Sequence, residues 1–212
     1  MNFRKKIREY ANVPITRHLI LDLLKDYNRP NDKISELIKN EELISLKRGL
    51  YVVGNNLDLP KPDTFLIANH LRGPSYVSIE SALSYYGLIP ERVFEISSVT
   101  TKISKKYRTP SGRYSYSHLP LPYYTFGIQY VEIAPKQFVL IASPEKAICD
   151  KIILTSKINF RSTNQVKSFL IEDLRMGKED LRDLNLKMIE TWLDDAPKRN
   201  SIKMLINTIR EL

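Results

Sequence analysis

The sequence predicts an α+β protein built in two parts. Helical periodicity fills about the first forty residues, and strand-like alternation begins after Glu42. Beyond residue 60, helical and strand-like segments mix before a helical tail that runs from Asn164 to Leu212. These observations indicate a small N-terminal domain, a linker and a larger mixed domain with C-terminal helices.

The N-terminal part is predicted to contain three helices and a hairpin. Apolar residues recur at helical spacing in three segments, which are residues 3–10, 15–27 and 31–40. The next segment, LISLKRGLYVV, alternates like a hairpin that turns at Lys47-Arg48-Gly49. Three helices followed by a two-stranded hairpin are typical of a winged helix-turn-helix domain, which we place at residues 1–56.

Residues 57–62 are predicted to form a linker, because Pro60 and Pro62 interrupt any periodicity. Residues 63–212 then form the α+β domain. We expect its elements to be a helix at 64–71, strands near 94–100 and 113–120, a hairpin at 127–142 and a helix beginning at Ser143-Pro144-Glu145.

The segment SYVSIESALSYYGLI, residues 75–89, is rich in serine and tyrosine and raises the question of a nucleophile. Its apolar residues fall at i, i+3, i+4 and i+7, which is one face of a helix. Ser78 is expected to cap this helix and Gly87 to end it. Because the G-x-S-x-G elbow of hydrolases is missing, we interpret the serines as structural.

The charge balance favours an anionic partner. Lys and Arg outnumber Asp and Glu by 33 to 24, which gives a net charge of +9. Nucleic acid is the first expectation and a membrane surface the second. No apolar run approaches the ~20 residues that span a bilayer, and no signal peptide is recognised. The lone Cys149 agrees with a reducing compartment, so we expect a cytoplasmic protein.

The third helix and the hairpin supply the candidate DNA contacts. In a winged helix the third helix enters the major groove and the hairpin tip contacts a flanking groove or the backbone. Asp32 and Glu36 on the same helix oppose phosphate, so a merely solvated polar face stays an alternative. The candidate residues are Arg29, Lys33, Ser35, Lys39, Asn40, Lys47 and Arg48.

A second cationic segment lies in the larger domain. No acidic residue occurs between Glu95 and Glu132, and three tyrosines are interspersed with the cations. Such a segment can contact phosphates and unstacked bases, or it can form an exposed hairpin whose lysines keep its edge soluble. Its basic residues are Lys102, Lys105, Lys106, Arg108 and Arg113.

Enzyme chemistry has little support. The three histidines are far apart, and there is neither a phosphate-binding glycine loop nor a zinc motif. Glu145 and Asp150 share a helix with Lys146 but are about 140° apart around it, so they do not converge on one metal. We therefore expect no catalytic residues, no metal and no cofactor. A metal-dependent nuclease and a protein-binding adaptor remain the alternatives.

Several motifs, taken in order, resemble the abortive-infection type IV antitoxins, the AbiEi-like family. The resemblance covers about residues 15–155, and the order of the motifs is more specific than any one of them. The motifs are Gly49-Leu50-Tyr51, Pro74-Ser75-Tyr76-Val77-Ser78, Ser81-Ala82-Leu83, Gly87-Leu88, a strand that ends at Thr100, and Ser143-Pro144-Glu145-Lys146-Ala147 before Asp150.

This resemblance implies a cytoplasmic antitoxin that represses its own operon. Its winged helix would bind double-stranded DNA at inverted repeats in the promoter. Its C-terminal domain would counter a nucleotidyltransferase-like toxin without a stable complex. The sequence does not decide between a monomer and a weak dimer.

Overall fold

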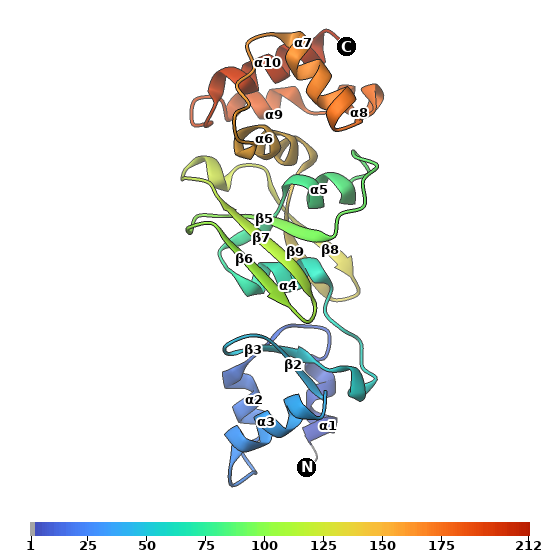
Figure 1. The fold of residues 1–212 in the computed structure, drawn as a ribbon, viewed down its shortest axis with the longest axis vertical. Coiled ribbons are helices and arrows are strands. Elements are labelled where there is room, and N and C mark those ends of the chain that lie inside the picture. Colours follow the sequence, from blue (N-terminus) through green and yellow to red (C-terminus); the bar gives the residue numbers. More distant parts are fainter. Residues whose placement is uncertain (1–2) are drawn as a thin grey trace.

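The computed structural model describes residues 3–212 and has three regions stacked along one long axis (Figure 1). A small N-terminal part lies at one end, a six-stranded sheet lies in the middle, and a group of helices lies at the other end. The protein is therefore α+β, as the sequence predicts.

The N-terminal part combines three helices with a three-stranded sheet of order β1-β3-β2, in which both pairings are antiparallel. Gly49 reverses the β2–β3 hairpin with a φ of 83°, a conformation that glycine adopts without strain. The elements are α1 (Phe3–Ile7), η1 (Arg8–Tyr10), β1 (Ile15–Thr16), α2 (Arg17–Leu23), α3 (Pro30–Lys39), β2 (Leu43–Lys47), β3 (Leu50–Val53) and η2 (Asn55–Leu57).

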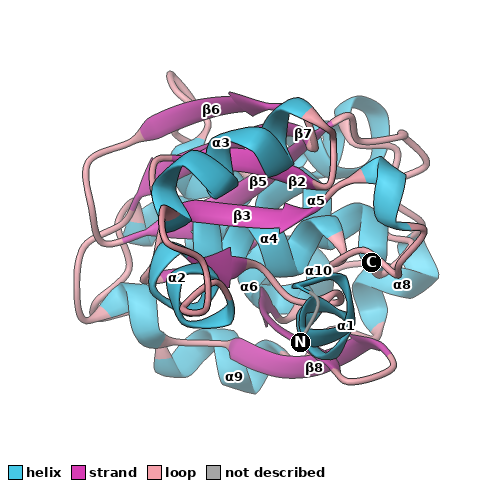
Figure 2. Ribbon diagram, turned by 90° about the horizontal axis from the view of Figure 1, so that it is seen from below, coloured by secondary structure: helices cyan, strands magenta, loops and turns pink. Residues whose placement is uncertain are grey.

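The β2–β3 hairpin lies between the N-terminal helices and the larger sheet (Figures 1 and 2). Leu43, Tyr51 and Val53 join the core formed by α1, α2 and α3. Leu46, Leu50 and Val52 belong instead to the core of the larger part. The hairpin thus has two buried faces. Beside it the two parts leave a cavity of about 570 Å³.

The middle region contains a mixed sheet of order β6-β7-β5-β4-β9-β8. The β5–β7 and β4–β9 pairings are parallel, and the other three are antiparallel. The sheet therefore has two edge strands, β6 and β8. The elements are α4 (Thr64–Leu71), β4 (Ser75–Val77), α5 (Ile79–Tyr85), β5 (Glu95–Thr100), β6 (Lys105–Thr109), β7 (Gly112–His118), η3 (Tyr123–Thr125), β8 (Ile128–Ala134) and β9 (Gln137–Ala142).

The helical region continues directly from β9. As the sequence predicts, Ser143 caps α6: its side chain accepts a hydrogen bond from the Lys146 amide. The elements are α6 (Pro144–Leu154), α7 (Thr163–Lys167), η4 (Ser168–Asp173), α8 (Lys178–Arg182), α9 (Leu186–Thr191) and α10 (Arg199–Arg210). Within residues 3–212, none of the helices combines the length and the apolar character needed to cross a membrane.

Several local predictions are wrong. Ile15 does not begin the second helix, because it pairs with Tyr51 in β1, and α2 starts at Arg17. The third helix starts at Pro30 rather than at residue 31. Ile38, one of the apolar residues at helical spacing in residues 31–40, is 37% exposed instead of buried.

Candidate nucleic-acid interface

The outward face of α3 carries fewer available cations than its sequence suggests. Ile34 and Leu37 anchor the helix in the N-terminal core. Lys33 donates to Glu36 at 2.6 Å, and this hydrogen bond is the main reason that the pKa of Lys33 is raised. Arg29 lies 3.8 Å from Asp32.

Three further candidates on α3 and just after it, Ser35, Lys39 and Asn40, are exposed. The Asn40 carbonyl accepts a hydrogen bond from Asn56, which places the C-terminal end of α3 beside η2. Of the two lysines in α3, Lys33 is paired with Glu36. Lys39 is exposed and belongs to none of the ion pairs found among residues 3–212.

The two cations at the hairpin turn have different environments. Lys47 is half-buried, and its ammonium donates to the Leu71 carbonyl oxygen at 2.6 Å. Arg48 is exposed and faces solvent at the turn. Lys47 thus helps to join the two parts, whereas Arg48 is available to a ligand.

Arg17, which sequence reasoning missed, lies beside this turn. Its amide donates to the Gly49 carbonyl at 2.9 Å, and its guanidinium donates to the Asn31 side chain at 2.8 Å. It therefore links the hairpin turn to the first turn of α3. Its position within the apolar stripe of residues 15–27 carries no signal of this contact, because β1 was not predicted.

Arg72, also missed from the sequence, connects the hairpin turn to the cationic strand β6. Its guanidinium donates to the Ile103 carbonyl and to the Tyr107 hydroxyl, the latter at 3.4 Å. The preceding residue, Leu71, accepts a hydrogen bond from Lys47. The segment Leu71–Arg72 therefore joins the cations of the hairpin turn to those of β6, which are far apart in the sequence.

The pKa of Tyr107 reports the same proximity. Burial pushes this pKa up, but the hydrogen bond from Arg72 and the charges of Lys105, Arg72 and Lys47 outweigh burial and hold it below its usual value. The ammonium of Lys105 lies 4.9 Å from the Tyr107 ring centroid. Lys47, at the base of the hairpin turn, thus adds a smaller share to the positive field of Arg72 and Lys105 around Tyr107.

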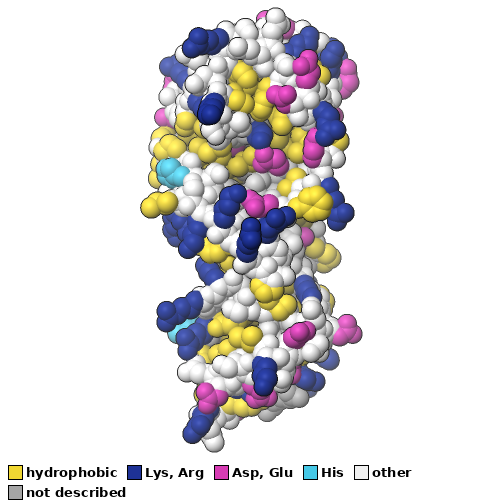
Figure 3. All heavy atoms as spheres, in the orientation of Figure 1, with side chains coloured by type: hydrophobic (Ala, Val, Ile, Leu, Met, Phe, Trp, Pro, Cys, Tyr) yellow, Lys and Arg dark blue, Asp and Glu magenta, His cyan; other side chains and the backbone are white. Residues whose placement is uncertain are grey.

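The remaining cations of the second segment line the β6–β7 hairpin. Lys102, Lys105, Lys106, Arg108 and Arg113 are all exposed, while Tyr114 and Tyr116 are buried. Lys106 lies 3.6 Å from Glu95, and Arg108 pairs directly with Arg113 across the two strands. Like charges in that position repel each other, so a bound anion would relieve the repulsion. Figure 3 shows Lys and Arg side chains gathered along the left edge of the molecule, from the N-terminal part to the central sheet.

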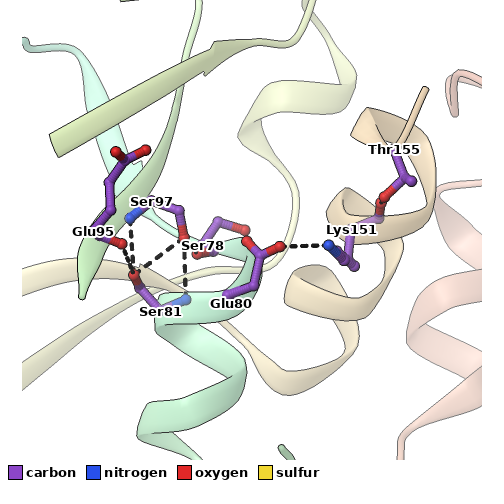
Figure 4. A network of polar contacts seen from close by, with 7 residues as sticks. All are labelled: Ser78, Glu80, Ser81, Glu95, Ser97, Lys151 and Thr155. Atoms are coloured by element: carbon purple, nitrogen blue, oxygen red, sulfur yellow. Dashed lines mark hydrogen bonds and ion pairs between the residues drawn. The ribbon is translucent and has the colours of Figure 1, made fainter. Parts of the chain in front are cut away.

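Ser78 and Ser81 hold the start of α5 against Ser97 of β5 (Figure 4). The Ser81 hydroxyl accepts from the Ser97 amide at 2.8 Å, and the Ser97 hydroxyl donates to the Ser78 carbonyl at 2.8 Å. Glu80 pairs with Lys151 on α6. Ser78 occupies the N-cap position of α5 as predicted, but the side-chain cap is absent, because its hydroxyl donates to Asp150 instead.

The segments around Tyr76 and Lys146, far apart in sequence, meet in a buried polar cluster. Lys146 and Asp150 are 3.0 Å apart, and both side chains are fully buried. Asp150 accepts hydrogen bonds from Tyr76 at 2.9 Å and from Ser78 at 2.8 Å. The Lys146 ammonium donates to the Tyr123 carbonyl and lies 3.4 Å from the Tyr123 ring centroid.

Burial dominates the electrostatics of this cluster. Desolvation raises the pKa of Asp150 and lowers the pKa of Lys146. The carboxylate of Glu145 is used elsewhere, since it accepts from Ser143 and from the Asn185 amide. No metal-binding group of His, Cys, Asp or Glu side chains occurs within residues 3–212. The cluster connects β4, α6 and η3 inside the larger core.

Comparison of the sequence with models of protein families and with curated proteins gives no match. Among solved structures, the chain is similar to the Rv2827c protein from Mycobacterium tuberculosis, whose crystal structure superposes with a TM-score of 0.61 at 14% sequence identity. The match covers 97% of this chain and 75% of that one. At this identity the similarity extends to the fold alone.

Proposed function

We propose that this protein is a DNA-binding transcriptional repressor and antitoxin. Residues 1–56 act as a winged helix-turn-helix that binds inverted repeats in the promoter of its own operon. The C-terminal part counters a nucleotidyltransferase-like toxin without a stable complex, a role that rests on the family resemblance alone.

The observation that carries the DNA-binding half is the continuity of three features. The elements follow the order helix, strand, helix, helix and hairpin around one small core. The hairpin turn presents Arg48 to solvent, and Arg17 joins that turn to α3. Leu71 and Arg72 extend the positive surface to β6. A duplex carries regularly spaced phosphates, so an extended row of cations suits it better than a compact anion.

Operator binding tests this function directly. We would titrate a labelled duplex that carries the inverted repeats upstream of the coding sequence and measure fluorescence anisotropy at fixed salt. Arg48→Ala should weaken binding by about 1–3 kcal/mol, the range for a specific contact. The control is Lys25→Ala, which should bind like the wild type. Lys25 is an exposed lysine just after α2, and its ammonium lies near the Asp22 carboxylate.

Two outcomes would oppose the proposal. Equal affinity of Arg48→Ala and wild type would remove the hairpin turn from the interface. Failure of the wild type to bind the duplex even at low salt would favour an adaptor that binds protein through its N-terminal part.

The antitoxin half requires a cellular test. Co-expression with the nucleotidyltransferase encoded beside it should restore growth that the toxin alone arrests. Rescue by an Arg48→Ala variant that no longer represses transcription would separate neutralisation from DNA binding. Growth arrest that persists with the wild-type protein would contradict the antitoxin assignment.

A further inference from the structure

Ile103 is an exposed apolar residue in a strongly cationic loop. It lies between β5 and β6 and is 84% exposed, more than any other large apolar side chain within residues 3–212. A single exposed apolar residue is ordinary on a protein surface. The surroundings of Ile103 are unusual, because the loop that carries it is strongly cationic.

The loop that carries Ile103 is held by hydrogen bonds on both of its sides. Arg72 donates to the Ile103 carbonyl, and the Lys102 ammonium donates to the Gly73 carbonyl. On the other side, the His118 amide donates to the Ser104 hydroxyl at 3.0 Å. The isoleucine side chain is therefore held out in solvent on a braced backbone, with little conformational entropy left to lose on binding.

The charges around the loop define the chemistry of its partner. Lys102 and Lys105 flank Ile103 in the chain, and both are exposed. Arg72 joins the loop to Leu71, which holds Lys47 at the base of the hairpin turn. A partner for this surface must carry negative charges on its outside. It must also have an apolar interior that one isoleucine side chain can reach.

A DNA duplex has this combination. Its phosphates lie on both rims of the minor groove, and its stacked bases form the apolar interior that proteins enter with isoleucine, leucine or phenylalanine wedges. A lipid surface is also anionic outside, but stable insertion there needs a larger apolar area than one isoleucine. The link from Ile103 through Arg72 and Leu71 to Lys47 at the base of the hairpin turn favours DNA.

We propose that Ile103 is a wedge that enters the minor groove next to the hairpin contact and partly unstacks one base step. Lys102 and Lys105 then contact the phosphates on the two rims. This inference rests on the proposed DNA-binding function and adds to it a residue that deforms the duplex.

The test uses the full-length protein and the same duplex, with 2-aminopurine substituted for adenine at successive positions. Wild-type protein should raise the 2-aminopurine fluorescence at one step, and energy transfer between dyes at the two ends should report a bend. Ile103→Ser should abolish both signals and weaken binding about tenfold. It should leave the salt dependence unchanged, because no phosphate contact is lost.

Two variants complete the design. Ile103→Met keeps an apolar side chain and should restore the fluorescence change. Phe94→Ser removes another apolar side chain, which is 70% exposed, and should behave like the wild type. Phe94 directly precedes β5, whereas Ile103 follows it.

The outcomes separate the two proposals. Wild-type protein that does not bind the duplex would overturn both. Binding that depends on Arg48, with equal fluorescence for wild type and Ile103→Ser, would overturn the wedge alone. Binding to phosphatidylserine vesicles that is lost in Ile103→Ser, without any effect on DNA, would overturn the wedge in favour of a lipid contact.

Discussion

At the scale of single residues, Lys146 and Asp150 form an ion pair whose two side chains are fully buried. A charge in a protein interior is tolerated only when it is paired and hydrogen-bonded. Asp150 has Lys146, Tyr76 and Ser78 as partners, and Lys146 has the Tyr123 carbonyl and ring as well. Each side chain therefore depends on the other.

Removing one partner should cost far more than removing both. Asp150→Ala leaves the Lys146 ammonium buried without a counter-charge and should lower the free energy of unfolding by about 3–5 kcal/mol. The double variant Lys146→Met, Asp150→Leu should recover much of this loss, because it buries no charge. Urea unfolding at neutral pH measures both, and equal losses in the two variants would contradict this account.

The ion pair between Arg4 and Glu42 makes stability depend on pH. The hydrogen bond from Arg4 is the main reason that the pKa of Glu42 lies below its ordinary 4.5. Glu42 therefore contributes stability above that value and loses it as the pH falls through the lowered pKa.

Glu42→Gln should accordingly reduce the acid-induced fall in the free energy of unfolding below about pH 4.5. The measurement is a series of urea transitions between pH 3 and 7 (on the order of one per half unit). Glu41→Gln, an exposed neighbour, should keep the wild-type dependence on pH. A pH profile that Glu42→Gln does not change would show that the pair contributes nothing to stability.

At the scale of elements, the two edge strands of the central sheet differ in character. β6 carries Lys105, Lys106 and Arg108, whereas β8 exposes Tyr130, stacked on Phe138 with ring centroids 5.1 Å apart. Lysines on an edge strand discourage pairing with another chain. On β6 they lie beside the hairpin turn, so the same side chains can serve the proposed interface.

Salt dependence distinguishes these two roles of β6. If Lys105 and Lys106 contact phosphates, the double variant to alanine should reduce the slope of log K against log salt by about 0.9 for each lost contact. Lys187→Ala, in α9 of the helical region, is the control and should keep the wild-type slope. An unchanged slope in the β6 variant would leave its lysines with a purely protective role.

Elements with strong local signals could be predicted from the sequence, and those that depend on distant partners could not. The β8–β9 hairpin and the Ser143 cap follow from turn residues and periodicity, and both are confirmed. β1 was missed because two residues become a strand only when β3 supplies the partner. Ser78 was misread because Asp150, 72 positions away, attracts its hydroxyl.

The candidate interface shows the same limit. The exposure of Arg48 and of the β6 cations could be predicted from the polar residues of the two hairpins. The role of Arg72 in joining them does not, because its partners come from a loop and a strand more than thirty residues away. Lys47 and Arg48 are adjacent in sequence, yet only the three-dimensional fold separates the buried one from the exposed one.

At the scale of the whole molecule, the hairpin with two buried faces should couple the stability of the two parts. Ile34→Ala creates a cavity in the N-terminal core only and should cost about 2–5 kcal/mol. Trp192, the sole tryptophan, lies in the other core and reports its unfolding by fluorescence. If the parts unfold together, Ile34→Ala should lower the midpoint of the Trp192 transition.

Lys39→Ala, on the exposed side of the same helix, is the control and should leave that midpoint nearly unchanged. A Trp192 transition that ignores Ile34→Ala, while far-ultraviolet circular dichroism detects an earlier loss of helix, would show that the two parts unfold independently.

The β2–β3 hairpin also limits how this chain can be recombined. The N-terminal part cannot be transferred alone to another protein, because Leu46, Leu50 and Val52 would become exposed and form an apolar surface prone to aggregation. Any fusion protein built from the first sixty residues would need those three positions redesigned to fit the domain that replaces the larger part.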